Sequence, residues 1–289
     1  MQSQTQNPSA ILLVSCPDHP GILAAVTSFV SQHGGNILEL DEHVEKLDDV
    51  FLMRVEWELD SFDLPRDRIA AGLQPIAERF SMNWSLYFSD DTPRMAIFAT
   101  KQSHCLHDLL ARYESGEWDV SIPVIISNHD TLRPVAERFD IEYHHIPITK
   151  ETKERQEEKQ LSILKEYDVD FIVLARYMQI LTPRFIEHYP NKIINIHHSF
   201  LPAFPGANPY RSAHRRGVKI IGATSHYVTE ELDGGPIIEQ DVVHVSHEDD
   251  VEDLKRKGQD LEKIVLARAV WNHIQRRILV HDNRTAVFD

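Results

Sequence analysis

Residues 192–210 of the chain read KIINIHHSFLPAFPGANPY. The stretch begins with three isoleucines in five residues, and a β-branched run of this kind is typical of a buried strand. A central strand does not continue through the residues that follow, which include Pro202, Pro205, Gly206 and Pro209. At the junction stand Asn195, His197 and His198, whose polar groups are costly to bury without partners. The stretch therefore predicts a buried strand that ends in functional polar residues.

Side-chain alternation separates these three polar residues. Residues two apart in a strand share a face, so we expect Asn195 and His197 to point together and His198 to point the other way into structure. An amide donor beside an imidazole suits a carbonyl whose oxygen becomes an oxyanion. The two adjacent histidines could instead bind a metal, but neighbouring strand residues diverge and no HxH or HExxH spacing supports such a site. We therefore expect no metal.

A later segment, EELDGGPII at residues 230–238, supplies a carboxylate for this imidazole. Asp233 stands at a predicted tight turn with Gly234, where backbone can approach a ligand closely. Its carboxylate can orient the imidazole or hold its proton. His226, earlier on the same predicted hairpin, can add a polar contact, so His226 and Gly234 are candidate substrate-binding residues. Asp233 could also be only a turn former and His226 only a satisfied sheet histidine. From the residues alone, the conclusion stops at carbonyl chemistry at a strand end.

The region around the quoted stretch alternates between strand-like and helix-like segments, beginning with MAIFAT at residues 95–100. This alternation predicts a doubly wound α/β domain with a mostly parallel sheet, whose ligands bind beyond the carboxyl ends of the strands. Residues 220–245 predict a β-hairpin about an Asp-Gly-Gly turn, and residues 248–276 predict a closing helix. We place this domain at residues 94–289.

Residues 9–90 predict a smaller domain with a different pattern. Strand-like and helix-like segments follow in the order β-α-β-β-α-β, which is the ferredoxin-like arrangement. The second predicted helix lies in PRDRIAAGLQPIAERF at residues 65–80, and its internal Pro75 should kink it or mark a break. SDDTPR, at residues 89–94, reads as a linker between the two domains.

The bulk composition narrows the classes of function. The 289 residues carry a formal net charge of −15 with 42% hydrophobic residues, which indicates a soluble globular protein and argues against nucleic acid or an anionic membrane as a main partner. The sequence shows no apolar run long enough for a membrane span and no charged-then-apolar signal region at its start.

Cys16 and Cys105 form no CxxC pattern, which favours free thiols in a reducing cytoplasm. Neither GxGxxG nor GxxxxGK[ST] follows a strand, so a phosphate-bearing cofactor has little support.

The segments NIHHSFLPAFPGANPY and IGATSHYVTEELDGGPII resemble the folate-dependent formyltransferase fold. In that fold an Asn-x-His pair and a later aspartate handle the formyl group of 10-formyltetrahydrofolate. The resemblance implies that Asn195, His197 and Asp233 are the catalytic residues. LARYMQIL, at residues 174–181, resembles the segment that lines the pterin pocket, which implies substrate-binding roles for Met178 and Leu181.

The chain is more closely similar to the formyltetrahydrofolate deformylase family, whose members place an ACT domain before a formyltransferase-like domain. VSCPDHPGILAAVTSFVSQHGGNI resembles the ACT module, and SHCLHDLLARYESGEW and VIISNHD resemble the deformylase versions of the first two βα units. The resemblance covers residues 9–289. It implies hydrolysis of 10-formyltetrahydrofolate to formate and tetrahydrofolate with no required cofactor, so that formate feeds purine biosynthesis and one-carbon pools are balanced.

One departure from the related transferases bears on the acceptor. Transferases acting on glycinamide ribonucleotide carry a glycine-rich phosphate cradle after the first strand, whereas this chain reads TKQSHCLHDLL there, without glycine. Water can then take the place of a phosphorylated amine. Two rival functions stay open: a formyltransferase to an unphosphorylated amine, and a non-catalytic amino-acid sensor built on a decayed fold.

The ACT resemblance also implies regulation and assembly. ACT modules commonly bind amino acids at strand-edge interfaces between subunits, which implies glycine or methionine as effectors and a homo-oligomer. The predicted helix start after PDHPG offers free amide groups that suit a carboxylate. Asp18 and Gly21 are therefore candidate effector-binding residues, with an ordinary capped turn as the alternative.

Overall fold

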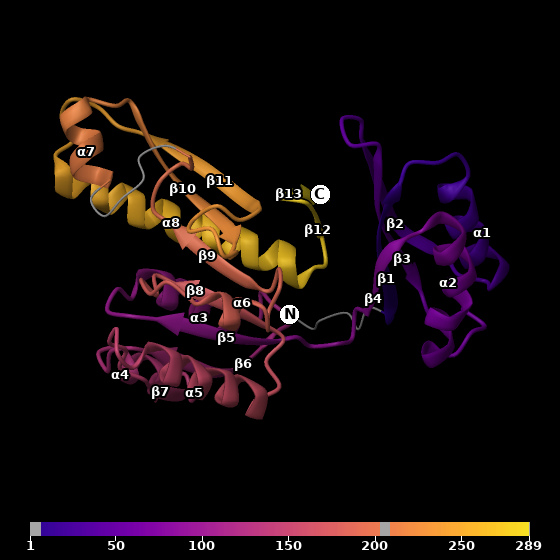
Figure 1. Ribbon diagram of the computed structural model, residues 1–289, viewed down its shortest axis with the longest axis horizontal. Helices are drawn as coiled ribbons and strands as arrows, with labels where there is room; N and C mark the ends of the chain where they lie inside the picture. The colour runs from indigo at the N-terminus through magenta and orange to yellow at the C-terminus, as the bar shows by residue number, and fades with distance from the viewer. Residues whose placement is uncertain (1–6, 203–208, 289) are drawn as a thin grey trace. The chain divides into compact units, whose positions relative to one another are not determined.

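The structure is a computed structural model that describes residues 7–202 and 209–288, so Pro205 and Gly206 of the quoted stretch lie outside the described residues. The described chain divides into two compact units. Figure 1 shows the elements of each unit in chain order.

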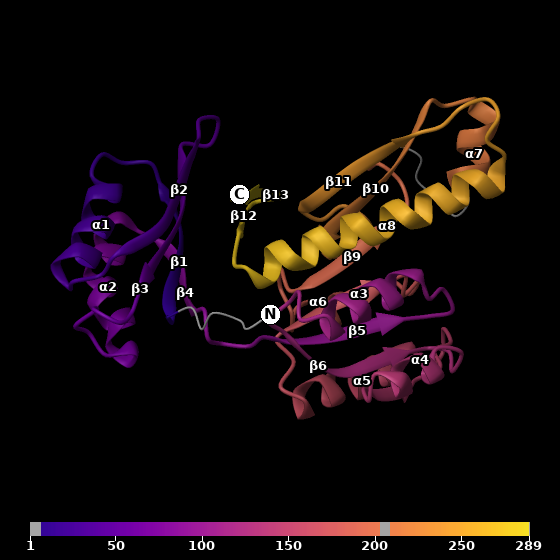
Figure 2. The same cartoon turned by 180° about the vertical axis from the view of Figure 1, so that it is seen from behind.

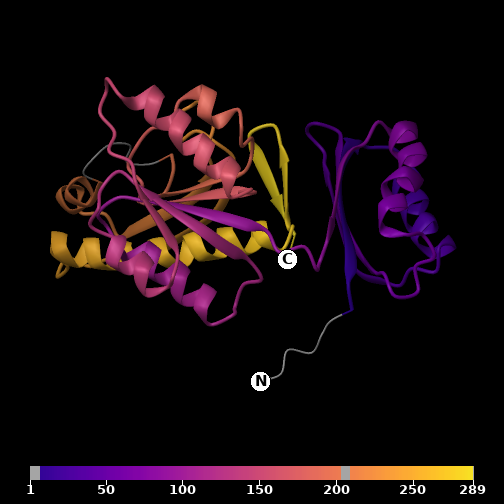
Figure 3. The ribbon, with the colours of Figure 1, turned by 90° about the horizontal axis from the view of Figure 1, so that it is seen from below.

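The first unit holds one four-stranded antiparallel sheet with the strand order β2-β3-β1-β4. Its elements are β1 (Ser9–Pro17), α1 (Ile22–Gln32), β2 (Ile37–Glu45), β3 (Val50–Glu58), α2 (Arg66–Phe80) and β4 (Asn83–Phe88). This is the predicted β-α-β-β-α-β order. Both helices lie on one face of the sheet (Figure 3), where residues such as Val26, Trp57 and Leu73 form a buried core.

Helix α2 runs through Pro75, so the predicted alternative of a break at this proline is wrong. A proline inside a helix removes one backbone hydrogen bond and crowds the preceding turn. Helical spacing nevertheless places Ile69, Leu73, Ala77 and Phe80 on one buried face of α2. Burial of these side chains against the sheet keeps the segment helical despite the proline.

The second unit holds a seven-stranded sheet with the order β11-β10-β9-β8-β5-β6-β7. Strands β5 (Arg94–Ala99), β6 (Ser121–Ser127), β7 (Glu142–His145), β8 (Phe171–Ala175) and β9 (Ile193–His197) pair in parallel, and β10 (Ile220–Tyr227) and β11 (Ile237–His244) add antiparallel strands at one edge. The helices are α3 (His104–Glu114), α4 (Arg133–Arg138), α5 (Lys153–Glu166), α6 (Pro183–Ile186), α7 (Pro209–Arg216) and α8 (Val251–Ile274). Together the two units confirm the predicted fold class.

The long helix α8 lies beside α3 and along β10, as Figure 2 shows from behind. It begins at a capping box in which the Asp250 side chain accepts from the backbone of Asp253 while Asp253 reaches back to the cap. On the sheet itself, Phe98 and Ile172 belong to the core cluster that includes Leu164 of α5. The central strands are therefore buried, and their polar ends are exceptions that need an explanation.

The last two strands, β12 (Ile278–His281) and β13 (Arg284–Val287), form a separate two-stranded sheet. By its internal contacts β12 groups with the first unit, as does most of β13. The sequence boundaries of 9–90 and 94–289 put these strands in the second domain, and that division stays a prediction. Within the described ranges, no helix combines the length and the apolar character needed to cross a membrane.

Candidate active site

Strands β9 and β10 bring the amide and one of the histidines together. In their antiparallel register, Asn195 of β9 stands opposite His226 of β10. Directly paired residues share a sheet face, so the two side chains meet, with Asn195 Nδ2 3.2 Å from His226 Nε2. The Ser225 hydroxyl donates to the backbone carbonyl of Asn195 at 3.1 Å and holds the strand in place.

The contacts of His226 fix both its tautomer and the direction of the Asn195 amide. His226 Nδ1 lies 2.9 Å from the backbone oxygen of Tyr227, and a carbonyl can only accept, so Nδ1 carries the hydrogen. In the neutral ring Nε2 then accepts from Asn195 Nδ2. Because Nδ2 carries two hydrogens, the second can be donated to a ligand. His226 is 2% exposed, so this arrangement is shielded from competing water.

Asp233 links both histidines. Its Oδ2 lies 3.3 Å from His197 Nδ1, and its Oδ1 lies 3.7 Å from His226 Nε2. The neighbouring His197 first and His226 second hold the pKa of the Asp233 carboxyl well below its usual range. Because the hydrogen of His226 is on Nδ1, Asp233 is a carboxylate that accepts from His197 Nδ1.

His197 presents one ring nitrogen that the protein does not use. The residue is 7% exposed, and its Nε2 is buried with no hydrogen-bond partner in the described part of the chain. Buried polar atoms are nearly always paired, so an orphaned nitrogen beside a carboxylate calls for a ligand. With Nδ1 directed at Asp233, Nε2 is the atom left to meet a substrate.

The connection that carries Asp233 differs from the predicted tight turn. It spans residues 228–236 between β10 and β11 and places Asp233 at a positive φ of 55°. A Cβ built on Gly235 would lie 1.9 Å from the backbone oxygen of Tyr227. The glycine is therefore needed for contact with the chain's own strand. The predicted ligand-binding residue Gly234 uses its carbonyl to accept from Asn283 Nδ2 at 2.7 Å.

The predicted direction of His198 is wrong. Its ring stacks on that of His197, with centroids 5.1 Å apart and an interplanar angle of 26°. Strand β9 ends at His197, so the alternation that would separate neighbouring side chains no longer applies to the next residue.

A hydroxyl that the sequence analysis missed holds the segment after β9. Thr224, which stands opposite His197 in the register, donates from Oγ1 to the Ser199 carbonyl at 2.9 Å and accepts from the Leu201 amide at 3.0 Å. Gln240 Nε2 also donates to Thr224 Oγ1, at 2.9 Å. The sequence feature that could have indicated this contact is the presence of two polar residues, Thr224 and Gln240, on the two predicted strands of the hairpin.

The remaining predicted residues lie in contrasting environments. Met178 is 61% exposed, whereas Leu181 is buried in the core cluster that includes Phe185. In the first unit, Asp18 and Gly21 are exposed, and Gly21 caps α1 at a φ of 98° without a side-chain hydrogen bond. Nothing in these positions tests a binding role, so all four assignments stay predictions.

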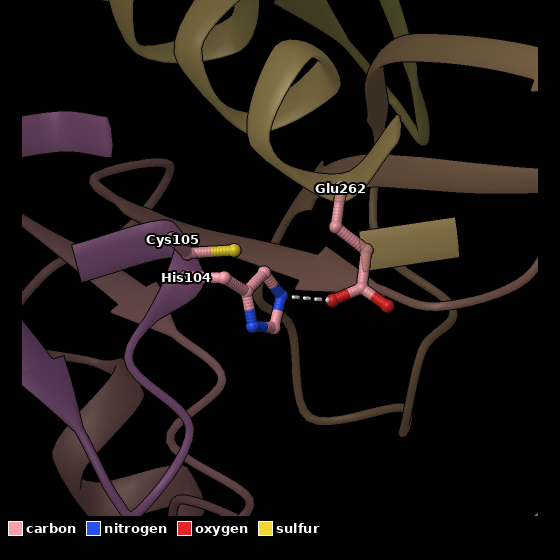
Figure 4. A group of neighbouring side chains, drawn as sticks. All are labelled: His104, Cys105 and Glu262. Carbon is pink, nitrogen blue, oxygen red and sulfur yellow. Dashed lines mark hydrogen bonds and ion pairs between the residues drawn. The ribbon is translucent and has the colours of Figure 1, made fainter. Parts of the chain in front are cut away.

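A second cluster resembles a metal site in composition. Figure 4 shows His104 and Cys105 of α3 facing Glu262 of α8. His104 Nε2 lies 2.7 Å from Glu262 Oε2, the Arg176 guanidinium lies 3.5 Å from the same oxygen, and Tyr210 donates to Oε1 at 2.9 Å. Burial raises the pKa of the Cys105 thiol. An engaged carboxylate, a neighbouring cation and a protonated thiol together disfavour a metal ion.

Known proteins resemble this chain over nearly its whole length. A family model described as formyl transferase matches residues 93–270, and one described as ACT domain matches residues 10–60. The formyltetrahydrofolate deformylase of Synechocystis sp. is 57% identical over 283 residues, which cover 98% of this chain and 99% of the relative.

Solved structures agree. A formyltetrahydrofolate deformylase from Pseudomonas syringae pv. tomato has a TM-score of 0.97 and 47% identity, covering 99% of this chain and 96% of that one. A glycinamide ribonucleotide transformylase from Symbiobacterium toebii has a TM-score of 0.65 and 30% identity, covering 71% of this chain and 98% of that one. Of these two structures, only the deformylase is similar to this chain over both units.

Proposed function

Since the chain belongs to the formyltetrahydrofolate deformylase family, we propose that it hydrolyses 10-formyltetrahydrofolate to formate and tetrahydrofolate at Asn195, His197 and Asp233. The observation that supports this site is the buried, unpartnered Nε2 of His197 next to the ionised Asp233. A histidine with one nitrogen on a carboxylate and the other open to substrate is suited to proton transfer.

In the proposed mechanism each of these groups has its own step. His197 Nε2 takes a proton from water as the water oxygen bonds to the formyl carbon, and the C=O electron pair moves to the formyl oxygen. The second N–H of Asn195 stabilises that oxyanion. Asp233, a weak base because its pKa is lowered, holds the His197 imidazolium and orients the water. The oxyanion then collapses, the bond from carbon to the 10-nitrogen breaks, and His197 gives its proton to that nitrogen.

The ACT match supports a small-molecule effector for the first unit. We propose glycine or methionine, with Asp18 and Gly21 at the uncapped start of α1 as contacts. We also propose a homo-oligomer paired through this unit, catalysis without an added cofactor, and a cytoplasmic location. Two cysteines that are both buried and unbridged support the last of these.

The test is hydrolysis without any amine acceptor. Purified protein mixed with 10-formyltetrahydrofolate should release formate and tetrahydrofolate in equal amounts. His197→Ala should lower turnover by about 10²–10⁴, because it removes the proton-transfer group. His188→Ala is a matched control, since His188 is an exposed residue just after α6 whose Nδ1 lies 2.8 Å from the Arg184 carbonyl oxygen.

Two results would replace this function with a rival. A formylated amine that forms together with tetrahydrofolate only after an unphosphorylated amine is added, without release of formate, would establish a transferase. Tight folate binding with no turnover under either condition would establish a sensor.

A further inference from the structure

His198 is a half-buried histidine that the proposed hydrolysis does not use, although it lies directly against the ring that transfers the proton. The rings of His197 and His198 are nearly parallel, at 26°, with centroids 5.1 Å apart. Beyond His198 lies the ring of Tyr210, at 6.1 Å between centroids. His198 is thus packed between the catalytic imidazole and a phenol.

Tyr210 is itself held in place from α8. Its hydroxyl donates to Glu262 Oε1 at 2.9 Å, and Glu262 is 1% exposed. A Cβ built on Gly258, one turn earlier on α8, would lie 2.1 Å from the Tyr210 hydroxyl oxygen. A helix interior normally disfavours glycine, so its presence here is explained by the room that Tyr210 requires.

The charges around His198 come from several elements. Arg176, directly after β8, is 7% exposed and donates from Nε to Gln102 Oε1 at 3.0 Å, and it also lies beside Glu262. His197 and Asp233 face His198 from the catalytic side, and Tyr210 from α7. Burial first, then Arg176 and His197, lower the pKa of His198 to about 4, against the opposing effects of Glu262 and Asp233.

A consequence follows for where the proton resides. At neutral pH His198 is uncharged, so the two stacked rings do not compete for positive charge. His197, next to the carboxylate of Asp233, is then the ring of this pair that exchanges a proton in the proposed hydrolysis. A flat, uncharged ring against His197 also limits rotation of that imidazole, because stacked aromatic pairs prefer a defined offset geometry.

We infer that His198 is a positioning residue, whose ring holds the His197 imidazole with Nδ1 on Asp233 and Nε2 toward the substrate. The inference rests on the proposed function, because it assigns a second ring to the same hydrolysis. Positioning acts on the chemical step more than on folate binding, since a small displacement of a catalytic group costs rate.

The test compares the loss of the ring with its replacement by another flat ring. His198→Ala should lower kcat about tenfold to a hundredfold with KM nearly unchanged. His198→Phe, which keeps a flat uncharged ring, should restore kcat to within about threefold of the wild type. A loss of folded protein would also lower kcat per total protein with KM unchanged, so kcat is expressed per folded protein, as measured by circular dichroism. A positioning role predicts that the loss persists after this correction and that the ring alone rescues it.

The matched control is His144 on β7, whose ring contacts Tyr167 with centroids 6.1 Å apart. His144→Ala and His144→Phe should leave kcat unchanged. If the alanine variant does not fold, His198→Asn takes its place, because asparagine also lacks an aromatic ring. The same loss of kcat is expected for it.

Wild-type kcat in both His198→Ala and His198→Asn would overturn the positioning role. So would a His198→Phe variant as slow as the alanine variant, since the ring would then act through its nitrogens. These results are distinct from failure of the proposed function, in which the wild-type protein itself releases no formate without an acceptor.

Discussion

His226 and His197 use their ring nitrogens in different ways, and this difference separates a supporting histidine from the one that we propose transfers the proton. His226 places Nδ1 on the Tyr227 carbonyl and Nε2 on the Asn195 amide, so both nitrogens serve the protein. His197 places only Nδ1, on Asp233. Sequence alone does not distinguish the two residues, because tautomers depend on partners that folding supplies.

The lowered pKa of Asp233 predicts a specific acid sensitivity of the fold. Its carboxyl pKa is lower in the folded protein than the ordinary value of about 3.9, so the unfolded chain binds more protons in acid. This contribution to the free energy of unfolding is present above pH 4, as a rough boundary, and is lost as the pH falls toward the folded-state pKa. Asp233→Asn should therefore be less stable than the wild type near neutral pH, with a difference that narrows in acid.

Urea unfolding at a series of pH values measures this difference. Asp260→Asn is a suitable control, because Asp260 is an exposed residue of α8 in a surface pair with Lys263. Parallel stability curves for Asp233→Asn and the wild type across the acid range would contradict the linkage.

The sequence predicted the strand face that carries Asn195 and His197 more accurately than the direction of the next residue. Period-two alternation placed Asn195 and His197 together because both lie inside β9. The same rule misplaced His198, which lies one residue beyond the last strand position. Side-chain alternation applies only within a strand, so its use depends on knowing where β9 ends. Here the segment just after β9 is held by hydrogen bonds from Thr224 of β10.

At the scale of elements, the connection between β10 and β11 decides whether the site exists. Residues 228–236 fold back so that Asp233 reaches His197, which pairs near the middle of β10 and not at its end. The hairpin strands were predicted from their composition, but this return path was not. It depends on the contact between Gly235 and the Tyr227 carbonyl, which joins residues from the two ends of the connection.

Gly235→Ala should therefore disable the enzyme without unfolding it. A Cβ 1.9 Å from the Tyr227 oxygen must displace the connection, and with it the Asp233 carboxylate. We expect kcat to fall on the order of 10² or more, as for a misplaced catalytic group. The measurement is formate release, with circular dichroism to verify the fold.

Gly116→Ala is the matched control for this prediction. Gly116 has a positive φ of 71°, but a Cβ there meets nothing within 4 Å, so the change adds backbone strain without a clash. It should cost roughly 1 kcal/mol of stability and leave kcat intact. Equal kcat values for the two variants would show that the clash at Gly235 is absorbed without moving Asp233.

At the scale of the whole molecule, the change of pattern near residue 90 marked two units, and the structure divides the chain close to that point. Alternating strand and helix segments indicated the parallel sheet, and the β-α-β-β-α-β order indicated the smaller fold. The grouping of β12 with the first unit was not predictable, because a short two-stranded sheet carries no signal of the surface it packs on.

The ACT unit should respond to a free amino acid. Glycine or methionine titrated into the protein should give a binding isotherm in calorimetry and a change in the rate of formate release. Asp18→Ala should weaken binding about tenfold, because a carboxylate near the start of α1 can pair with the ligand ammonium group. Asp67→Ala is the control, since Asp67 lies in the first turn of the other helix of the same unit. Absence of both binding and a rate change would contradict the sensing role.

The grouping of the C-terminal strands has a consequence for how the protein is made. Residues 93–275 of the second unit form one continuous stretch, whereas the first unit gains β12 only from residues near the end of the chain. Domains generally fold as units while the ribosome still synthesises the chain, beginning with the first to emerge. Because the first unit takes residues from both sides of residues 93–275, it is complete only after that stretch has been synthesised. The second unit can therefore complete its own sheet before the first unit is finished.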